Sequence, residues 1–367
     1  MSAVAVVRKQ RGSGFAGAGL GLAVLSAGTF GTSGTFADGL IRAGWSPAAA
    51  VTVRISLSAL ILTIPALISL RGRWALLRRD AGRVALYGLI AVAGCQLFYF
   101  NALQSIPVGV ALLLEYLGSV FVVGWVWLRH GERPRGLTVA GAVAAVAGLV
   151  MVLNLTGATH VNPIGVMWGL LAACGLAVYF VVSSAAPART PAGEPAEPLP
   201  PIAMAWGGMC VGAVALAVLG FSGALPLHAT SADVSLLGTR VSWIVPVLGL
   251  SLIAAVIAYV AGIGAARRLG AKLASFIGMT EVLFAILFAW LALGQLPTPI
   301  QFLGGAFILV GIGLVRAGER APVPVTADEA TADETVPGEK VIDQTVTGGT
   351  LAGGTLAGGV AIEEPVK

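Results

Sequence analysis

The chain has 367 residues, of which 57% are hydrophobic and only 11% are charged. Soluble domains contain about 25% charged residues, so this composition excludes an ordinary soluble globular protein and favours one that lies largely in a membrane. The net charge of +5 combines basic loops with an acidic tail. This distribution indicates membrane topology and argues against a nucleic-acid-binding surface.

Ten apolar runs follow one another along the chain. A membrane-spanning helix needs about 20 mostly apolar residues, and runs near that length cover 15–36, 48–68, 84–104, 108–128, 137–155, 164–184, 202–221, 243–265, 273–293 and 300–316. Because the bilayer offers no water to unpaired backbone groups, runs of this length form helices rather than open strands. We therefore predict an all-α membrane protein with ten transmembrane helices.

Three segments lie outside this pattern. Residues 1–14 are predicted to form a cytoplasmic N-terminal segment. The stretch 187–201 contains six prolines and is predicted to be a solvated loop. Residues 317–367 are acidic, weakly hydrophobic and contain the pentad Gly-Gly-Thr-Leu-Ala twice, which predicts a disordered cytoplasmic tail.

Basic residues are concentrated in alternate loops. Seventeen Lys and Arg residues lie before the first run, in every second loop after it, or just after the tenth run, whereas the other loops hold only Arg42 and Arg240. Loops rich in Lys and Arg stay in the cytoplasm. This asymmetry predicts that both termini are cytoplasmic, and it requires an even number of spans.

An internal repeat joins the two parts of the chain. Residues 101–152 match residues 264–315 at a constant offset of 163 without a gap. The matched pairs include Phe121 with Phe284, Trp127 with Trp290, Pro134 with Pro297, Gly141 with Gly304 and Gly148 with Gly311. Since five spans is an odd number, the halves 15–155 and 164–316 are predicted to be two inverted five-helix repeats, with a substrate site between them near the membrane midplane.

Three strongly ionisable side chains fall well inside the predicted spans: Arg54, Glu115 and Glu281. Each costs at least about 2.5–3.5 kcal/mol at a helix centre, so such residues usually face a bundle interior or mark a pathway. Arg54 and Glu115 lie at similar depths, which allows either a static salt bridge or a pair that substrate or a proton breaks. Glu281 lies close to the midplane, where it is either a structural residue or a carboxylate that exchanges a proton.

Polar and aromatic side chains near the same depth are candidates for lining a cavity. They are Gln96, Tyr99, Asn101, Gln104, Tyr116, Tyr179 and Tyr259. Gln96 and Tyr259 are equivalent under the 163-residue offset, which favours a shared inward face. The alternative for each residue is a hydrogen bond between helices or a position in the interfacial aromatic belt.

Other motifs have simpler explanations. Residues 12–17 match a dinucleotide-binding fingerprint, but no strand precedes them and an apolar run follows, so coincidence is favoured. The three cysteines and three histidines are scattered, and we expect neither a metal site nor a cofactor nor a catalytic group. Gly141, Gly148, Gly304 and Gly311 give the fifth and tenth spans matching smooth faces, suited to packing between the halves or to a homodimer contact.

The ends of the fourth and ninth spans carry a family resemblance. The stretch Thr280-Glu281-Val282-Leu283-Phe284, followed by the ending Leu293-Gly294-Gln295, is similar to a Glu-Pro-containing helix that ends in Gly-Glu in the EamA family of the drug/metabolite transporter superfamily. Val282 stands where proline is common, and Gln295 stands where glutamate is common.

The first half keeps part of the same pattern. Gly131-Glu132-Arg133 has the usual ending, while Gly118-Ser119 replaces Glu-Pro. The stretch from Leu114 to Gly118 is similar to the amino-acid exporter branch. The resemblance covers about residues 15–316 and implies a ten-helix carrier that moves small metabolites or drugs, often outward and driven by ions.

We therefore expect a multi-pass protein of a bacterial inner membrane that exports small metabolites, amino acids or drugs by alternating access, coupled to protons. The expected substrate- or proton-binding residues are Arg54, Gln96, Asn101, Glu115, Tyr116, Tyr259 and Glu281. A facilitative or exchange carrier without proton coupling, similar to nucleotide-sugar carriers, is the main alternative. The sequence contains no filter-like loop of the kind that channels use. It also contains no cluster of catalytic residue types, so neither a channel nor a membrane-embedded enzyme is favoured, and we expect no enzyme.

Overall fold

The structure is a computed structural model, and it describes residues 3–103, 105–106, 108–131, 133–153, 162–186, 197–236, 238–293 and 296–320. The predictions that concern Gln104, Glu132, Gly294 and Gln295, most of the proline-rich loop and the tail from residue 321 fall outside these ranges.

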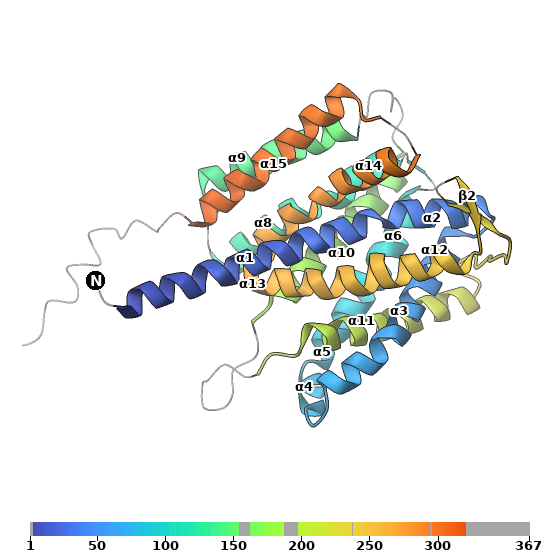
Figure 1. Cartoon of the computed structure of the whole chain (residues 1–367), viewed down its shortest axis with the longest axis horizontal. Helices are drawn as coiled ribbons and strands as arrows, with labels where there is room; N and C mark the ends of the chain where they lie inside the picture. The colour runs from blue at the N-terminus through green and yellow to red at the C-terminus, as the bar shows by residue number, and fades with distance from the viewer. Residues whose placement is uncertain are drawn as a thin grey trace, which may run out of the picture. The chain divides into compact units, whose positions relative to one another are not determined.

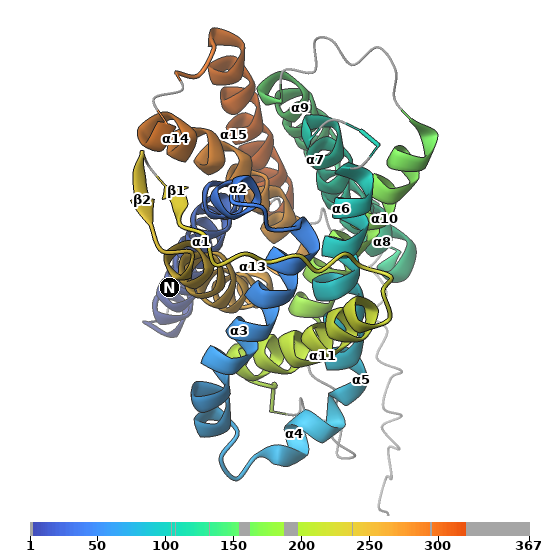
Figure 2. The ribbon, with the colours of Figure 1, turned by 90° about the vertical axis from the view of Figure 1, so that its right-hand side faces the viewer.

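Helices account for most of the described chain, as two views at right angles show (Figure 1 and Figure 2). The first half contains α1 (Ala3–Gly31), α2 (Ser33–Arg42), α3 (Pro47–Ser69), α4 (Trp74–Arg79), α5 (Ala81–Leu86), the π-helix η1 (Tyr87–Gly94), α6 (Cys95–Leu103), α7 (Val108–Tyr116), α8 (Gly118–His130) and α9 (Gly136–Val152). The second half contains α10 (Pro163–Ser184), α11 (Pro201–Phe221), β1 (Val234–Leu236), β2 (Thr239–Val241), α12 (Ile244–Leu248), the π-helix η2 (Gly249–Ile257), α13 (Ala258–Gly278), α14 (Thr280–Leu293) and α15 (Pro299–Arg320).

The predicted fold class, an all-α membrane protein, is confirmed. In the described ranges, seven helical segments are long and apolar enough to cross a membrane, and Gly136–Val152 is a shorter apolar helix. The exact number of ten spans stays a prediction. One short antiparallel hairpin, in which Val234 pairs with Val241, lies between α11 and α12 and was not expected.

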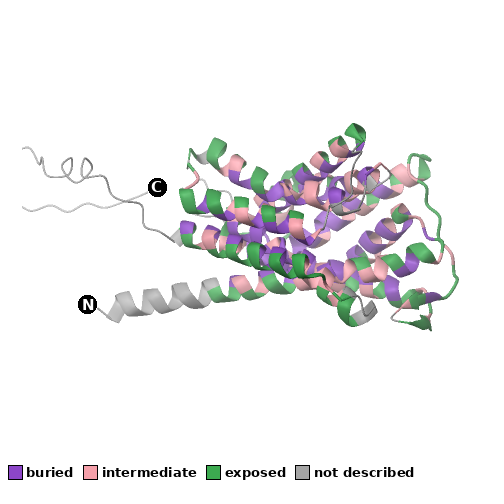
Figure 3. Cartoon of the chain, turned by 90° about the horizontal axis from the view of Figure 1, so that it is seen from above, coloured by how far each residue is buried: buried purple, intermediate pink, exposed green. Residues whose placement is uncertain are grey.

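Large apolar side chains lie exposed on the outer faces of the helices. On α3, Leu60, Ile64 and Ile68 are each about 70% exposed, and they follow one another at the spacing of one helical turn. Figure 3 shows the buried residues on the inward-facing sides of the helices. A soluble monomer rarely exposes such a continuous apolar surface, whereas lipid covers it without cost.

The basic loops meet at one end of the helices. Arg73 pairs with Glu197 at 2.6 Å, and Arg267 donates to the Leu199 carbonyl, so the segment before α11 contacts both the turn before α4 and the helix α13. Arg135 donates to the Gly318 carbonyl at 2.7 Å. These contacts support a single basic side, and its assignment to the cytoplasm stays a prediction.

The two π-helices occupy equivalent positions in the repeat. Residues 87–94 of η1, shifted by the offset of 163, become 250–257, which lies within η2. A π-helix is a rare, locally widened turn that often occurs at functional sites. In both halves, the residues that follow it face the interior cavity described below.

Glycines account for a break between the predicted spans 243–265 and 273–293 and for a close helix contact inside the predicted span 108–128. Within α13, Gly270 has a φ of 79°, which interrupts the helix. Such a left-handed conformation is costly for residues with a Cβ atom. Between α7 and α8, Gly118 lies against α10, where a Cβ atom would come within 2.6 Å of the Ala173 carbonyl oxygen.

The glycines of α9 and α15 bring these two helices together within one chain. A Cβ atom on Gly148 would lie 2.5 Å from the Gly304 carbonyl oxygen, and one on Gly311 would lie 2.6 Å from the Gly141 carbonyl oxygen. Figure 1 shows α9 and α15 side by side. The glycine faces therefore pack the fifth predicted span against the tenth. This agrees with the predicted packing between the halves, and these faces give no support to the alternative, a homodimer contact.

We predict that Gly311→Ala lowers the stability of the detergent-solubilised protein by about 1–3 kcal/mol, because an added methyl group overpacks a backbone contact. The matched control is Gly313→Ala on the same helix, where a Cβ atom would meet nothing within 4 Å. Thermal unfolding of the two variants measures the difference. Equal melting temperatures would contradict the assigned packing.

Candidate functional site

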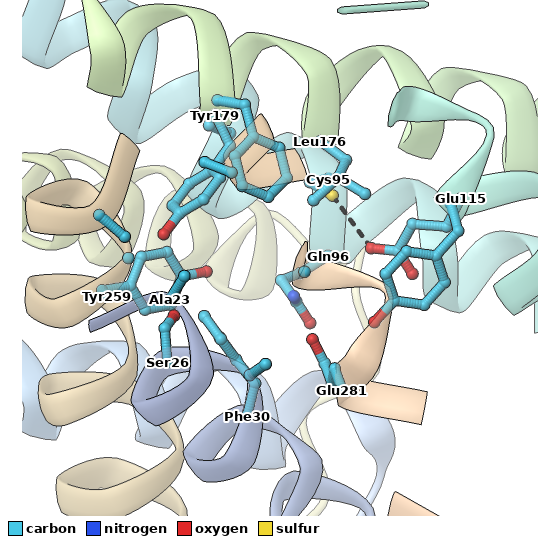
Figure 4. A pocket seen from close by; sticks show the side chains of 18 residues that line it. Ala23, Ser26, Phe30, Cys95, Gln96, Glu115, Leu176, Tyr179, Tyr259 and Glu281 are labelled. Atoms are coloured by element: carbon cyan, nitrogen blue, oxygen red, sulfur yellow. Dashed lines mark hydrogen bonds between the residues drawn. The ribbon is translucent and has the colours of Figure 1, made fainter. Parts of the chain in front are cut away.

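A buried cavity lies between the two halves of the chain. Its volume is about 90 Å³, and it is lined by residues of α1, η1, α6, α7, α10, α13 and α14. Its polar lining residues are Ser26, Cys95, Gln96, Glu115, Tyr116, Tyr179, Tyr259 and Glu281. Figure 4 shows the labelled members of this set pointing toward one shared space.

Glu115 enters the cavity from the last turn of α7. The Cys95 thiol lies 3.4 Å from a carboxylate oxygen of Glu115 and is placed to donate to it. The boundary between α7 and α8 follows at Leu117, which keeps helical backbone angles, and Gly118 lies against α10 directly after it.

Glu281 enters from the other half, in the first turn of α14. The unpaired amide groups at a helix N-terminus favour a negative charge in that turn. The Tyr116 hydroxyl interacts with this carboxylate, and the Gln96 side chain points toward it in Figure 4. The two acids that the sequence places in different halves thus face one cavity.

The two acids are not equivalent under the repeat. At the offset of 163, Glu281 corresponds to Gly118 and Glu115 corresponds to Gly278. Gly278 also lines the cavity, so each half contributes its acid one helical turn away from the equivalent position. Gln96 and Tyr259, which are equivalent, both line the cavity as predicted.

Arg54 does not pair with Glu115, although the sequence predicted either a static salt bridge or a breakable pair between these two residues. It is 5% exposed, donates to the Ala254 carbonyl in η2 at 2.6 Å and to the Ser33 hydroxyl at 3.2 Å. No ion pair joins it to Glu115 within the described ranges. Because α3 packs against η2, Arg54 forms its hydrogen bond there.

Asn101 also differs from its prediction. Its amide donates to the Leu97 carbonyl on its own helix at 2.8 Å, and the residue is not among those that line the cavity. This hydrogen bond directs one amide donor back onto the residue's own helix.

Aromatic rings form one wall of the cavity. The ring centroids of Phe30 and Tyr259 are 5.0 Å apart, those of Tyr179 and Tyr259 are 5.7 Å apart, and those of Tyr179 and Phe180 are 4.8 Å apart. These edge-to-face contacts hold the rings in fixed orientations. The Arg54 guanidinium lies over the Phe30 ring, 5.8 Å from its centroid.

Sequence reasoning missed the contribution of α1. Ser26 and Phe30 line the cavity, and the Ser26 hydroxyl donates to the Ala258 carbonyl at 2.8 Å. The first predicted span contains no ionisable residue, so no charge inside the membrane indicated that this span lines a site. A lone serine within an apolar run was the available sign.

Comparisons with known proteins agree with this architecture. A 111-residue stretch is 33% identical to the aromatic amino acid exporter YddG of Ancylobacter novellus, covering 30% of this chain and 39% of that protein. A 72-residue stretch is 32% identical to the pseudopaline exporter CntI of Pseudomonas aeruginosa, covering 20% of this chain and 25% of that protein. The chain thus matches less than half the length of either relative.

A solved crystal structure matches 83% of this chain and 98% of its own chain with a TM-score of 0.62 at 19% identity, which establishes a shared fold alone. The model of the EamA-like transporter family matches residues 17–154 and again residues 163–317. These two matches correspond to the two halves that meet at the cavity, and the chain belongs to the EamA-like transporter family.

Proposed function

We propose that this protein is a secondary active transporter that exports small organic molecules across a bacterial inner membrane. Membership of a transporter family, two relatives that are named exporters and the apolar outer faces of the helices support this proposal. We also propose that both termini lie in the cytoplasm, on the side of the basic loops.

The observation that carries the proposal is the convergence of Glu115 and Glu281 on one cavity between the halves. A transporter built from two repeats exposes a midplane site alternately to each side by moving one half against the other. A cavity with walls from both halves changes its access when the halves move. We therefore propose alternating access around this cavity.

We propose protons as the coupling ion, exchanged at Glu281 and Glu115. A carboxylate inside a membrane protein is a proton-relay candidate, and one that also contacts substrate makes proton binding and substrate binding compete. The titratable and charged groups that act on these two acids come from several helices. They are Arg54 on α3, Cys95 and Tyr99 on α6, Tyr116 on α7, Tyr179 on α10 and Tyr259 on α13.

Arg54 is proposed as a counter-charge that acts at a distance. Its guanidinium lies over the Phe30 ring and outside the cavity lining, and its electrostatic interactions reach Tyr259 and Glu281. It therefore offsets part of the negative charge of the site without occupying the cavity. The names of the relatives suggest amino-acid-like metabolites as the first compounds to test.

We predict that everted membrane vesicles containing the protein accumulate part of a radiolabelled amine, amino-acid and metabolite panel only when the lumen is acidic. Export in the cell corresponds to uptake in everted vesicles, and outward proton flow drives it. Glu281→Gln and Glu115→Gln keep the side-chain shape but exchange no proton. Each variant should reduce the gradient-driven accumulation at least about tenfold, the effect of removing one positioned acid-base group.

The matched control is Glu197→Gln, since Glu197 is 52% exposed and pairs with Arg73 at the basic end. It should accumulate substrate like the unmodified protein. Substrate accumulation that is the same with and without a protonophore would rule out proton coupling and favour a facilitative or exchange carrier. Full transport activity of Glu281→Gln would do the same.

We further predict that Gly262→Ala impairs transport. Gly262 lines the cavity, and a Cβ atom there would clash with the Tyr179 hydroxyl and lie 2.8 Å from the Ser26 hydroxyl. Displacing Tyr179 into the cavity should slow uptake about fivefold or more, because overpacking costs about 1–3 kcal/mol.

Gly264→Ala on the same helix is the control for this variant, because its Cβ atom would meet only the ends of the Leu22 and Arg268 side chains at 3.2 and 3.3 Å. Initial uptake rates are compared at equal amounts of protein in the membrane. Equal rates for the two variants would place the transport site elsewhere.

A further inference from the structure

The charge of the cavity lining is one-sided. Glu115 and Glu281 contribute two carboxylates, whereas the described residues that line the cavity include no Lys, Arg or His. The remaining polar lining groups are hydroxyls, one thiol and one amide. A ligand that enters this space therefore meets two acidic side chains and no basic side chain in the described lining.

Arg54, a strong base close to this site, does not line the cavity. Its two terminal nitrogens donate to the Ala254 carbonyl and the Ser33 hydroxyl, and its guanidinium lies 5.8 Å from the centroid of the Phe30 ring, which does line the cavity. A carboxylate on a substrate would thus find no ion-pair partner in the lining of the cavity and would approach two like charges whenever both acids are ionised. Unpaired charge in a low-dielectric site is strongly unfavourable.

The aromatic wall completes a site for the opposite charge. The rings of Phe30, Tyr179 and Tyr259 line the cavity together with the carboxylates. An ammonium group close to an aromatic face gains about 0.5–2 kcal/mol, with the larger values at desolvated sites. Rings on one side and acids on the other are arranged to hold a cation.

We propose that the cavity selects organic cations, namely protonated amines or quaternary ammonium groups on an apolar or aromatic body, over zwitterionic amino acids and over anions. This inference rests on the proposed function, since it names the substrate class of the same site. The cavity of about 90 Å³ is smaller than the roughly 150 Å³ that binds benzene. In the described conformation the cavity therefore has room for the ammonium group of the substrate. We propose that the apolar or aromatic part of the substrate enters in a conformation with a larger cavity.

Three probes that differ only in charged groups test this selectivity. 2-Phenylethylamine is phenylalanine without its carboxylate, and 3-phenylpropionate is phenylalanine without its amine. Competition against radiolabelled 2-phenylethylamine is measured at neutral pH on the purified full-length protein in lipid nanodiscs. We expect the amine to bind at least about tenfold more tightly than phenylalanine, which corresponds to one uncompensated charge of about 1.4 kcal/mol, and phenylpropionate to bind most weakly.

Two further measurements separate charge recognition from general affinity for a ring. Trimethyl-2-phenylethylammonium, which has a permanent charge and no N–H donor, should compete within a few-fold of the amine. Glu281→Gln and Glu115→Gln should each weaken amine binding at least about tenfold, and Glu197→Gln should leave it unchanged. The two cavity variants should fold like the unmodified protein, as their thermal unfolding can verify.

Phenylalanine binding as tight as that of the amine would overturn the inference, as would the absence of amine binding or amine binding that neither cavity variant weakens. Failure of the proposed function gives a different pattern. If the amine binds selectively but no panel member accumulates in acidified vesicles, transport fails while cation selectivity stands. If phenylalanine accumulates with the gradient and the amine does not compete, transport stands and cation selectivity fails.

Discussion

A carboxylate among apolar helices needs a polar surrounding, and the centre of this structure is built around that requirement for Glu115 and Glu281. Neither residue can face lipid without a cost of several kcal/mol. Both are partly buried and face the same cavity, and each has a neighbouring donor, the Cys95 thiol for Glu115 and the Tyr116 hydroxyl for Glu281. The helices that supply these donors therefore have to meet here.

The π-helices connect this centre to the surrounding packing. In η2, the Ser251 and Ala254 carbonyls accept from Ser58 at 2.9 Å and from Arg54 at 2.6 Å. In the equivalent η1, α11 approaches through glycine instead, and a Cβ atom on Gly88 would lie 2.5 Å from the Gly208 carbonyl oxygen. The same widened turn is thus held by polar side chains in one half and by close backbone contact in the other, so the repeats are alike in path and different in chemistry.

Much of the helical architecture could be predicted because the length of an apolar run and the offset of a repeat are written directly in the sequence. Glu115 and Glu281 were identified because a charge inside a span is rare. The pairing of Arg54 with Glu115 could not be decided, because depth along the membrane fixes one coordinate and leaves the facing direction open. Ser26 was missed because a small hydroxyl within an apolar run is compatible with either a wall position or a bond inside the helix bundle.

The glycine contact between α9 and α15 also constrains how the protein is made. The smooth face of α9 is synthesised with the first half, and the helix that covers it emerges only after the whole of α10 to α14. Until then, Gly141 and Gly148 have only lipid or transient neighbours against them. Closure of this contact is therefore a late event of membrane assembly, because a chain that ends before α15 lacks the helix that covers Gly141 and Gly148.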